Sequence, residues 1–208
     1  MQILFISDEE QEKEIRQKSI HEEVAVIFAN KFINGQDYKK YDALFILTDI
    51  NNFIDFRYSE RQPVYINSVV NTLATLQKPA NISRMNGWPG FLQRDVWEVA
   101  TQNTEETQQI FSRIGWRIKL LPDEPGFVAA RVLSMIINEA FFALEDKVST
   151  TDEIDVAMKL GTNYPYGPFE WAKKIGTKNI LDLLNKLAEK DRRYLPSTAL
   201  EQYQFKQK

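Results

Sequence analysis

The stretch PGFVAARVLSMIINEAFFALEDKVSTTDEIDVAMKLGTNYPYGPF, residues 125–169, holds the most apolar helix that the sequence predicts. Between residues 128 and 144, apolar side chains fall on nearly every face of that helix. A helix that is apolar all round must be buried on all sides, and a domain of about ninety residues can surround it only in part. We therefore predict a homodimer through residues 128–145, in which a second copy covers the rest.

The remainder of the C-terminal part also reads as helical. Thr150 and Glu153 have the spacing of a capping box, and Gly161 is expected to end the helix that they begin. Pro168 suits the first position of a further helix, which Gly176 ends. An all-α domain is therefore expected.

The N-terminal part alternates short apolar runs with polar segments. The runs that we interpret as strands are residues 2–6, 24–29, 43–48, 64–67 and 116–121. Residues 8–20 read as an exposed helix with oppositely charged side chains four residues apart. This alternation predicts a parallel sheet. Because Pro122 and Pro125 end the pattern, we place the domain boundary there, with an α/β domain over residues 1–122 and a helical domain over 123–208.

Composition excludes several classes of protein. The net charge of −3 offers no basic surface for phosphates, so we expect no nucleic-acid partner. With no cysteine and a single histidine, His21, disulfides, thiol nucleophiles and metal sites are not expected. No apolar run approaches the roughly 18 residues of a membrane span, so we expect no membrane partner and a cytoplasmic location.

Several motifs of the C-terminal part occur together and in order. They are Pro125-Gly126-Phe127 followed by Arg131, Asn138-Glu139-Ala140, Ile154-Asp155 with Ala157-Met158, the segment 161–169, and the tail 193–197. Together they resemble the C-terminal domain of the 3-hydroxyacyl-CoA dehydrogenases. The resemblance implies a Rossmann-like N-terminal domain, here shortened between its second and third strands, followed by a helical dimerisation domain.

The resemblance also implies NAD as cofactor, bound at a glycine-rich turn after the first strand. Here that turn reads Ser7-Asp8-Glu9-Glu10. Carboxylates at a helix N-terminus stabilise the helix dipole themselves and repel a phosphate. The second strand, which should end in an acid for the ribose hydroxyls, ends at Asn30. We therefore expect no cofactor and no cofactor-binding residues.

In the family a histidine acts as the base, oriented by a glutamate, and serine and asparagine hold the substrate oxygen. Counting back from Glu98 puts the histidine position at Asn86, whereas counting from Arg84 puts it at Pro89, and neither accepts a proton near neutral pH. The serine position carries Val69 or Val70 and the asparagine position carries Ala130. No intact catalytic set is therefore expected, and Glu98 alone is interpreted as a structural carboxylate.

A ligand pocket could still be lined by residues from both domains. The candidates are Asn67, Ser68, Trp88, Glu98, Tyr164, Tyr166 and Phe169. The segment 163–169 could instead pack one helix on another, and the Trp88 loop could fill the space of a substrate. His21, beside Glu22 and Glu23, is interpreted as a solvated loop residue.

Two functions remain open at this point, with a third that no motif supports. The first is a dehydrogenase-like protein without hydride transfer, acting as a dimeric binding or scaffold module for acyl-CoA or for enzymes of acyl-CoA metabolism. The alternative is an active NAD-dependent 3-hydroxyacyl-CoA dehydrogenase of fatty acid metabolism with relocated groups. The third is a different enzyme that uses Glu98, Asp95 or Arg94 in the same cleft.

Overall fold

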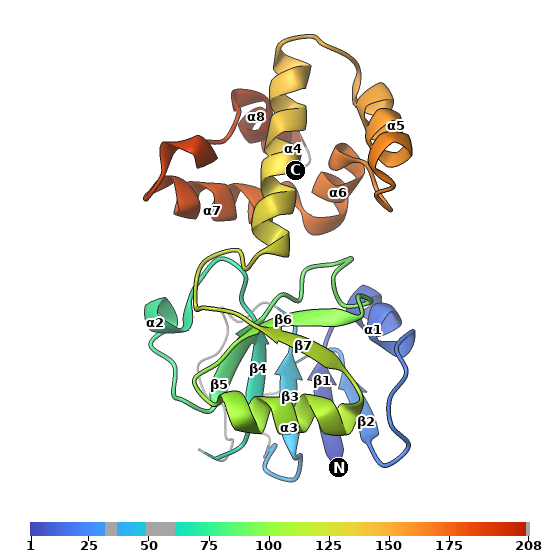
Figure 1. Cartoon of the computed structure of the whole chain (residues 1–208), viewed down its shortest axis with the longest axis vertical. Coiled ribbons are helices and arrows are strands. Elements are labelled where there is room, and N and C mark those ends of the chain that lie inside the picture. The colour runs from blue at the N-terminus through green and yellow to red at the C-terminus, as the bar shows by residue number, and fades with distance from the viewer. Residues whose placement is uncertain (32–36, 49–60, 207–208) are drawn as a thin grey trace. The chain divides into compact units, whose positions relative to one another are not determined.

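The computed structural model describes residues 1–31, 37–48 and 61–206. They form two compact units, Met1–Phe127 and Val128–Lys208 (Figure 1). The units divide after Phe127 rather than at Pro122. The reason is that Asp123 and the carbonyl of Glu124 are hydrogen-bonded to Arg84 of the first unit.

The first unit is built on a seven-stranded sheet in the order β2-β1-β3-β4-β5-β6-β7. Its strands are β1 (Gln2–Ile6), β2 (Ala25–Ala29), β3 (Ala43–Ile46), β4 (Val64–Asn67), β5 (Ile82–Met85), β6 (Val96–Ala100) and β7 (Arg117–Leu120). Neighbouring strands are parallel except β5 and β6, which are antiparallel. The predicted α/β class with a mainly parallel sheet is confirmed.

Aromatic side chains fill one face of this sheet. Phe5, Phe45 and Tyr65 lie in register on β1, β3 and β4, with ring centroids 4.5 and 4.7 Å apart. Phe111 of α3 (Thr104–Ile114) meets Phe45 and Tyr65 edge-on. Ile15 of α1 (Glu9–Arg16) joins the same cluster. These contacts hold α1 and α3 on one face.

The other face of the sheet has a smaller apolar cluster. It contains Leu4, Leu44 and Val64 from the strands, together with Tyr38 and Leu73, the first residue of α2 (Leu73–Leu76). Strands buried on both faces read as continuous apolar runs. For this reason β1, β3 and β4 were recognisable in the sequence.

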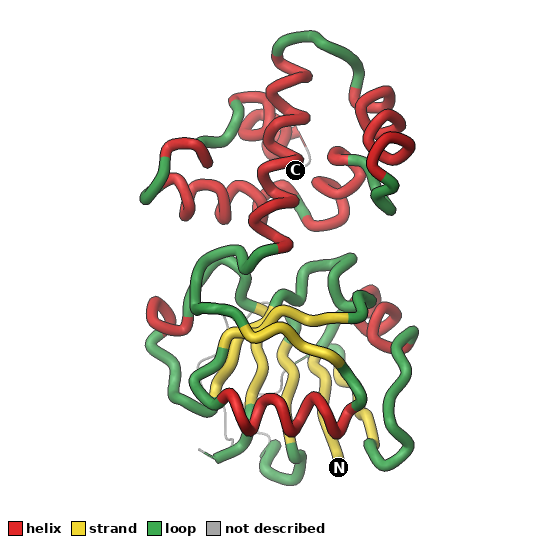
Figure 2. Tube along the Cα trace, in the orientation of Figure 1, coloured by secondary structure: helices red, strands yellow, loops and turns green. Residues whose placement is uncertain are grey.

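The second unit consists of helices arranged around α4 (Figure 2). They are α4 (Ala129–Glu145), α5 (Thr151–Thr162), α6 (Pro168–Ile175), α7 (Thr177–Ala188), the short 3-10 helix η2 (Arg192–Tyr194) and α8 (Thr198–Lys206). α4 packs against α6, α7 and α8. The predicted helical domain is confirmed. Among the described residues, no helix is both long and apolar enough to cross a membrane.

A buried asparagine fixes the tail of the chain to α4. Asn138 donates to the carbonyl of Leu195 at 2.9 Å and accepts from the amide of Ser197 at 2.8 Å. The carboxylate of Glu145 accepts from the amide of Ala199 at the start of α8. Residues 195–199 are thus held by two polar side chains of one helix.

The end of α5 differs from the prediction. The capping box of Thr150 and Glu153 is present, but Gly161 lies inside the helix and does not end it. Asn163 takes the left-handed conformation at the C-cap, with φ of 54°. Asparagine adopts this conformation more readily than most residues, so the helix runs past the glycine.

α6 begins on a carboxylate that comes from α5. Asp155 is buried and accepts from the amides of Phe169 at 2.8 Å and Glu170 at 3.2 Å. A Cβ on Gly167 would lie only 2.3 Å from Asp155 Oδ1. The chain therefore needs glycine at position 167 because the Asp155 carboxylate approaches the backbone closely there.

We predict opposite effects from two Gly→Ala variants on either side of this turn. Gly167→Ala displaces Asp155 and weakens the cap of α6, which lowers the free energy of unfolding by roughly 1–2 kcal/mol. Gly161→Ala meets no atom within 4 Å and removes glycine from a helix, which raises that free energy by about 0.5–1 kcal/mol. Urea denaturation of both variants checks this. Equal changes in the free energy of unfolding would contradict the inference that Asp155 requires glycine at position 167.

Candidate functional site

The place in this sheet where a ligand would be expected is the carboxyl end of β1 and β3. β1 lies between β2 and β3. The chain therefore continues from β1 to β2 on one side of it and then crosses to β3 on the other side. Open parallel sheets bind ligands in the crevice at such a switch point. The residues that follow these strands decide what the crevice can hold.

The helix that follows β1 is capped by its own side chains. Asp8 accepts from the amide of Gln11 at 2.8 Å, and Gln11 Oε1 accepts from the amide of Asp8 at 3.1 Å. Glu9, Glu10 and Glu12 occupy the first turn. The amides of Asp8 and Gln11, at the place where a glycine-rich turn would face an anion, are thus bonded to each other's side chains among negative charges.

The side chain of Gln11 reaches from α1 to the chain that follows two strands. It is buried, and its Nε2 donates to the carbonyl of Leu47 at 3.0 Å and to that of Gly87 at 3.3 Å. Leu47 follows β3 and Gly87 follows β5. One amide group from α1 therefore ties together the ends of two strands.

Asn67, a predicted pocket residue, makes the neighbouring link. Its Nδ2 donates to the carbonyl of Leu47 at 3.1 Å, and its Oδ1 accepts from the amide of Gly87 at 3.0 Å. A Cβ on Gly87 would be 2.9 Å from Asn67 Cγ. Asn67 therefore connects β3, β4 and the chain after β5.

Asn86 lies beside Glu98, the glutamate that the family pattern retains. Asn86 is buried, and its Nδ2 donates to Glu98 Oε2 at 3.2 Å. Its Oδ1 accepts from the amide of Trp88 at 3.4 Å. Of the two alternatives, Asn86 and Pro89, the structure places Asn86 against the glutamate. An amide thus occupies the place next to Glu98.

The Trp88 loop is held by a buried carboxylate of α1. Glu14 accepts from the amides of Gly90 at 2.6 Å and Leu92 at 3.1 Å. Trp88 and Phe91 are both buried. The expectation of an exposed helix over residues 8–20 is wrong in one respect, because Gln11, Glu14 and Ile15 form a buried face of α1. Two of these three residues are polar, so hydrophobic periodicity did not reveal them.

The remaining candidates of the first unit lie in different surroundings. Ser68 is buried, donates to the carbonyl of Asn71 at 2.8 Å and accepts from Arg84 through its own carbonyl. His21 packs against the turn after α3, where a Cβ on Gly115 would be 2.8 Å from its ring. The structure brings Asn67 and Trp88 to the crevice region around Gly87 and puts His21 at the end of α3.

The three aromatic candidates of the second unit have different degrees of exposure. Phe169 is buried and meets Phe141 of α4 at 4.8 Å. Tyr166 meets Trp171 at 4.8 Å. Tyr164 remains 38% exposed. Phe169 packs α6 on α4, and Tyr166 packs the loop before α6 on that helix.

A buried cation that sequence reasoning missed lies at the end of β5. Arg84 is fully buried, with Nε 2.5 Å from Asp123 Oδ1, Nη1 3.1 Å from the carbonyl of Ser68 and Nη2 2.6 Å from that of Glu124. Its guanidinium lies 4.1 Å from the centre of the Phe127 ring. Burial lowers the pKa of Arg84, and Asp123 opposes that shift.

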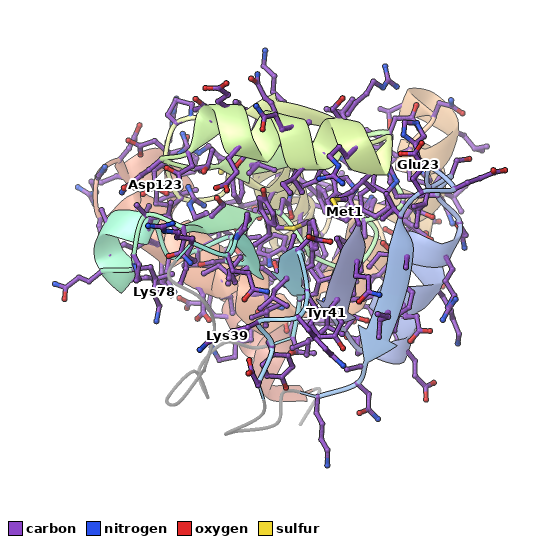
Figure 3. All side chains as sticks on the ribbon, turned by 90° about the horizontal axis from the view of Figure 1, so that it is seen from below. Met1, Glu23, Lys39, Tyr41, Lys78 and Asp123 are labelled. Carbon is purple, nitrogen blue, oxygen red and sulfur yellow. The ribbon has the colours of Figure 1, made fainter. Side chains whose placement is uncertain are left out.

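Asp123 completes this group of contacts beside α2 (Figure 3). Its carboxylate accepts from Arg84 and from the amides of Leu73 and Ala74. Burial by itself raises the pKa of Asp123, but these hydrogen bonds outweigh it and hold the pKa below its ordinary value. The charged form is therefore the one that the fold stabilises.

Comparison with known proteins places the second unit in a family. The family described as 3-hydroxyacyl-CoA dehydrogenase, C-terminal domain, matches residues 126–208. The 3-hydroxyadipyl-CoA dehydrogenase of Escherichia coli is 42% identical over 90 residues, which are 42% of this chain and 19% of that protein. The human mitochondrial hydroxyacyl-coenzyme A dehydrogenase is 30% identical over 148 residues, 68% of this chain and 47% of that protein. The matched part is thus less than half of either relative.

Solved structures extend the likeness to the whole fold. The (S)-3-hydroxybutyryl-CoA dehydrogenase of Ralstonia eutropha superposes with a TM-score of 0.65 at 23% identity, over 85% of this chain and 69% of that one. The 3-hydroxybutyryl-CoA dehydrogenase of Escherichia coli gives 0.58 at 30% identity, over 68% and 31%. The predicted Rossmann-like sheet followed by a helical domain is confirmed.

We predict that Arg84→Met lowers the free energy of unfolding by roughly 3 kcal/mol, because the carbonyls of Ser68 and Glu124 lose the guanidinium donor and Asp123 loses its cationic partner. Asp123→Asn removes a carboxylate whose contribution to stability depends on pH. The pKa of Asp123 is lowered from 3.8 in the folded state, so its stabilisation is present above that value and is lost as the pH falls below it.

Denaturation of the Asp123→Asn variant between about pH 3 and pH 7 tests the second part. The difference from the wild type should shrink on acidification. Asp95→Asn is the matched control, because Asp95 and its partner Arg117 are 86% and 72% exposed, and exposed pairs contribute little. If the difference in unfolding free energy between Asp123→Asn and the wild type did not change with pH, the lowered pKa of Asp123 would be contradicted.

Proposed function

Because this chain belongs to the 3-hydroxyacyl-CoA dehydrogenase family through residues 126–208, we propose that it is a dehydrogenase-like protein without hydride transfer. In this proposal it acts as a dimeric binding or scaffold module in acyl-CoA metabolism. The relatives named above are dehydrogenases of hydroxyacyl-CoA compounds. What this chain keeps of them is the fold.

The observation that carries the proposal is the set of hydrogen bonds across the switch point. Gln11 and Asn67 both bond to the carbonyl of Leu47 and to Gly87. A dinucleotide at this place would have to break these bonds, of which those of Gln11 are buried, and approach the carboxylates of Asp8 and Glu9. The residues present therefore do not fit NAD.

Proton transfer meets a second obstacle. Asn86 is an amide that does not ionise near neutral pH, and its hydrogen bond to Glu98 engages one carboxylate oxygen. A general base must lie within hydrogen-bond reach of the proton that it removes. His21, which packs on Gly115, is not bonded to Glu98. The hydrogen-bonded pair of Asn86 and Glu98 is suited to holding the Trp88 loop in place.

The alternative is an active dehydrogenase with relocated groups. The half-buried Glu98 favours it, because a carboxylate at this edge of the sheet could serve as a base. This alternative requires measurable binding of the nicotinamide cofactor, which the scaffold proposal does not. The two proposals therefore differ first in whether the chain binds the nicotinamide cofactor.

We predict that the purified chain does not oxidise NADH in the presence of acetoacetyl-CoA above the buffer background. We also expect neither heat in titration calorimetry nor a thermal shift with NADH, because α1 caps itself with Asp8. An active relative measured in parallel is the positive control. NADH oxidation above background would refute the proposal and leave the active dehydrogenase.

Ligand binding is a separate question. Crystals soaked with acetoacetyl-CoA or with coenzyme A test whether electron density appears near Glu98 or near Tyr166. Density at either place would support a binding module. Its absence, together with no heat on titration of either compound, would leave a scaffold for proteins.

The dimer is proposed from the apolar surface of α4. Val128 and Val132 lie one turn apart and are 56% and 52% exposed, and Phe142 further along is 37% exposed. Exposed apolar side chains on one helix face mark an interaction surface. A second copy of the chain is the partner that residues 128–145 suit best.

We predict that Val132→Lys weakens this dimer at least tenfold, because a charge would be placed in an apolar interface. Sedimentation equilibrium at several concentrations measures the change. Gln109→Lys, on the exposed face of α3, is the matched control and should leave the mass unchanged. A wild type that is monomeric throughout would refute the dimer through residues 128–145.

A further inference from the structure

β2 lies at the edge of the sheet, beside β1 (Figures 1 and 3). Its sequence, Ala-Val-Ile-Phe-Ala, contains no charged residue, no proline and no glycine. Ala25 is exposed, Ile27 is 37% exposed and the other three residues are half-buried. Natural edge strands are usually protected by charges, prolines or bulges. β2 has none of these within its five residues.

The hydrogen bonds to β1 show which backbone groups of β2 face away from the sheet. The amide of Ala25 donates to Met1, and the carbonyl of Ala29 accepts from Ser7. In a parallel ladder the residues that bond to one neighbour alternate with those that face the other side. The backbone groups of Val26 and Phe28 therefore point outward, where no described strand pairs with them.

We propose that β2 pairs antiparallel with β2 of a second copy, around a two-fold axis at Ile27. In this register Val26 of one copy exchanges both backbone hydrogen bonds with Phe28 of the other. Ala25 lies opposite Ala29, and Ile27 lies opposite itself. The outward-facing residues of each strand are thus the ones that form hydrogen-bonded pairs.

Charge selects both the partner and this register. Glu23 lies in the turn two residues before the strand, Lys31 lies in the bend two residues after it, and both are exposed. Centring on Ile27 overlaps all five residues of each strand and brings the acidic N-terminal end of one strand beside the basic C-terminal end of the other. Opposite charges across a ladder are favourable. A slip of two residues moves these ends apart and shortens the ladder.

The surface is distinct from the α4 face, because it belongs to the first unit and needs nothing from residues 128–208. A pairing of main chains with complementary ends suits a second copy of this chain better than an unrelated peptide. Pairing through β2 therefore does not depend on the function proposed above.

Single cysteines test the register, since the chain has no cysteine of its own. Ile27→Cys would place two sulfurs on the axis at a non-hydrogen-bonded pair, where Cα atoms are about 4.5 Å apart, which a disulfide can bridge. Ala25→Cys lies opposite Ala29, so its two copies are roughly 13 Å apart along the strands and cannot be bridged. Copper–phenanthroline oxidation of the full-length variants compares them.

We expect Ile27→Cys to form a covalent dimer at least tenfold faster than Ala25→Cys. The difference should persist when Val132→Lys is added, since that change concerns only the α4 face. Equal rates for the two cysteines, or no dimer of Ile27→Cys, would overturn the proposal. Dimers that vanish with Val132→Lys would overturn it as well, because the β2 edge would then not associate by itself.

Val26→Pro gives an independent measurement. It removes an outward-facing amide and leaves the bonds to β1 in place, a position where an edge strand tolerates proline. We expect the mass measured by sedimentation in the Val132→Lys background to fall to that of the monomer. An unchanged mass would overturn the proposal, and if Val26→Pro fails to fold the cysteine pair decides alone.

Discussion

The first unit depends on one buried charge. Arg84 has no exposed surface, and it is compensated by the carboxylate of Asp123, two carbonyls and the ring of Phe127. A buried guanidinium is tolerated only where its donors are satisfied. Satisfying them fixes the course of residues 123–127, which continue the fold of the sheet unit after β7. The left-handed backbone at Gly126 and Phe127, with φ of 83° and 49°, is part of the same arrangement.

Neutral amide side chains link separate segments of the chain at the carboxyl end of the sheet, as Arg84 does elsewhere in the unit. Gln11 and Asn67 bond to backbone groups that follow β3 and β5, and Asn86 bonds to Glu98 of β6. An amide is both donor and acceptor and carries no charge, so it can satisfy backbone groups without a counter-ion. A ligand site in the same place would need polar groups free to meet the ligand. The chain uses them to hold itself together.

The residues that carry the family resemblance in the second unit are structural ones. Asn138 holds the tail, Asp155 caps α6, and Gly167 leaves room for that carboxylate. The positions to which the resemblance assigns the family's chemistry carry Asn86 or Pro89 and Ala130 in this chain. Kinship of this kind transmits a fold, while function has to be argued from the site.

The sequence by itself determined five of the seven strands of the sheet, the helical character of the second unit and the family, because buried parallel strands and capped helices leave local patterns. Only the tertiary structure decided that Gln11 and Glu14 turn inward, that Arg84 binds Asp123, and that α5 continues past Gly161. These contacts join residues far apart in the chain or depend on how close two backbones come, and neither leaves a periodic signal in the sequence.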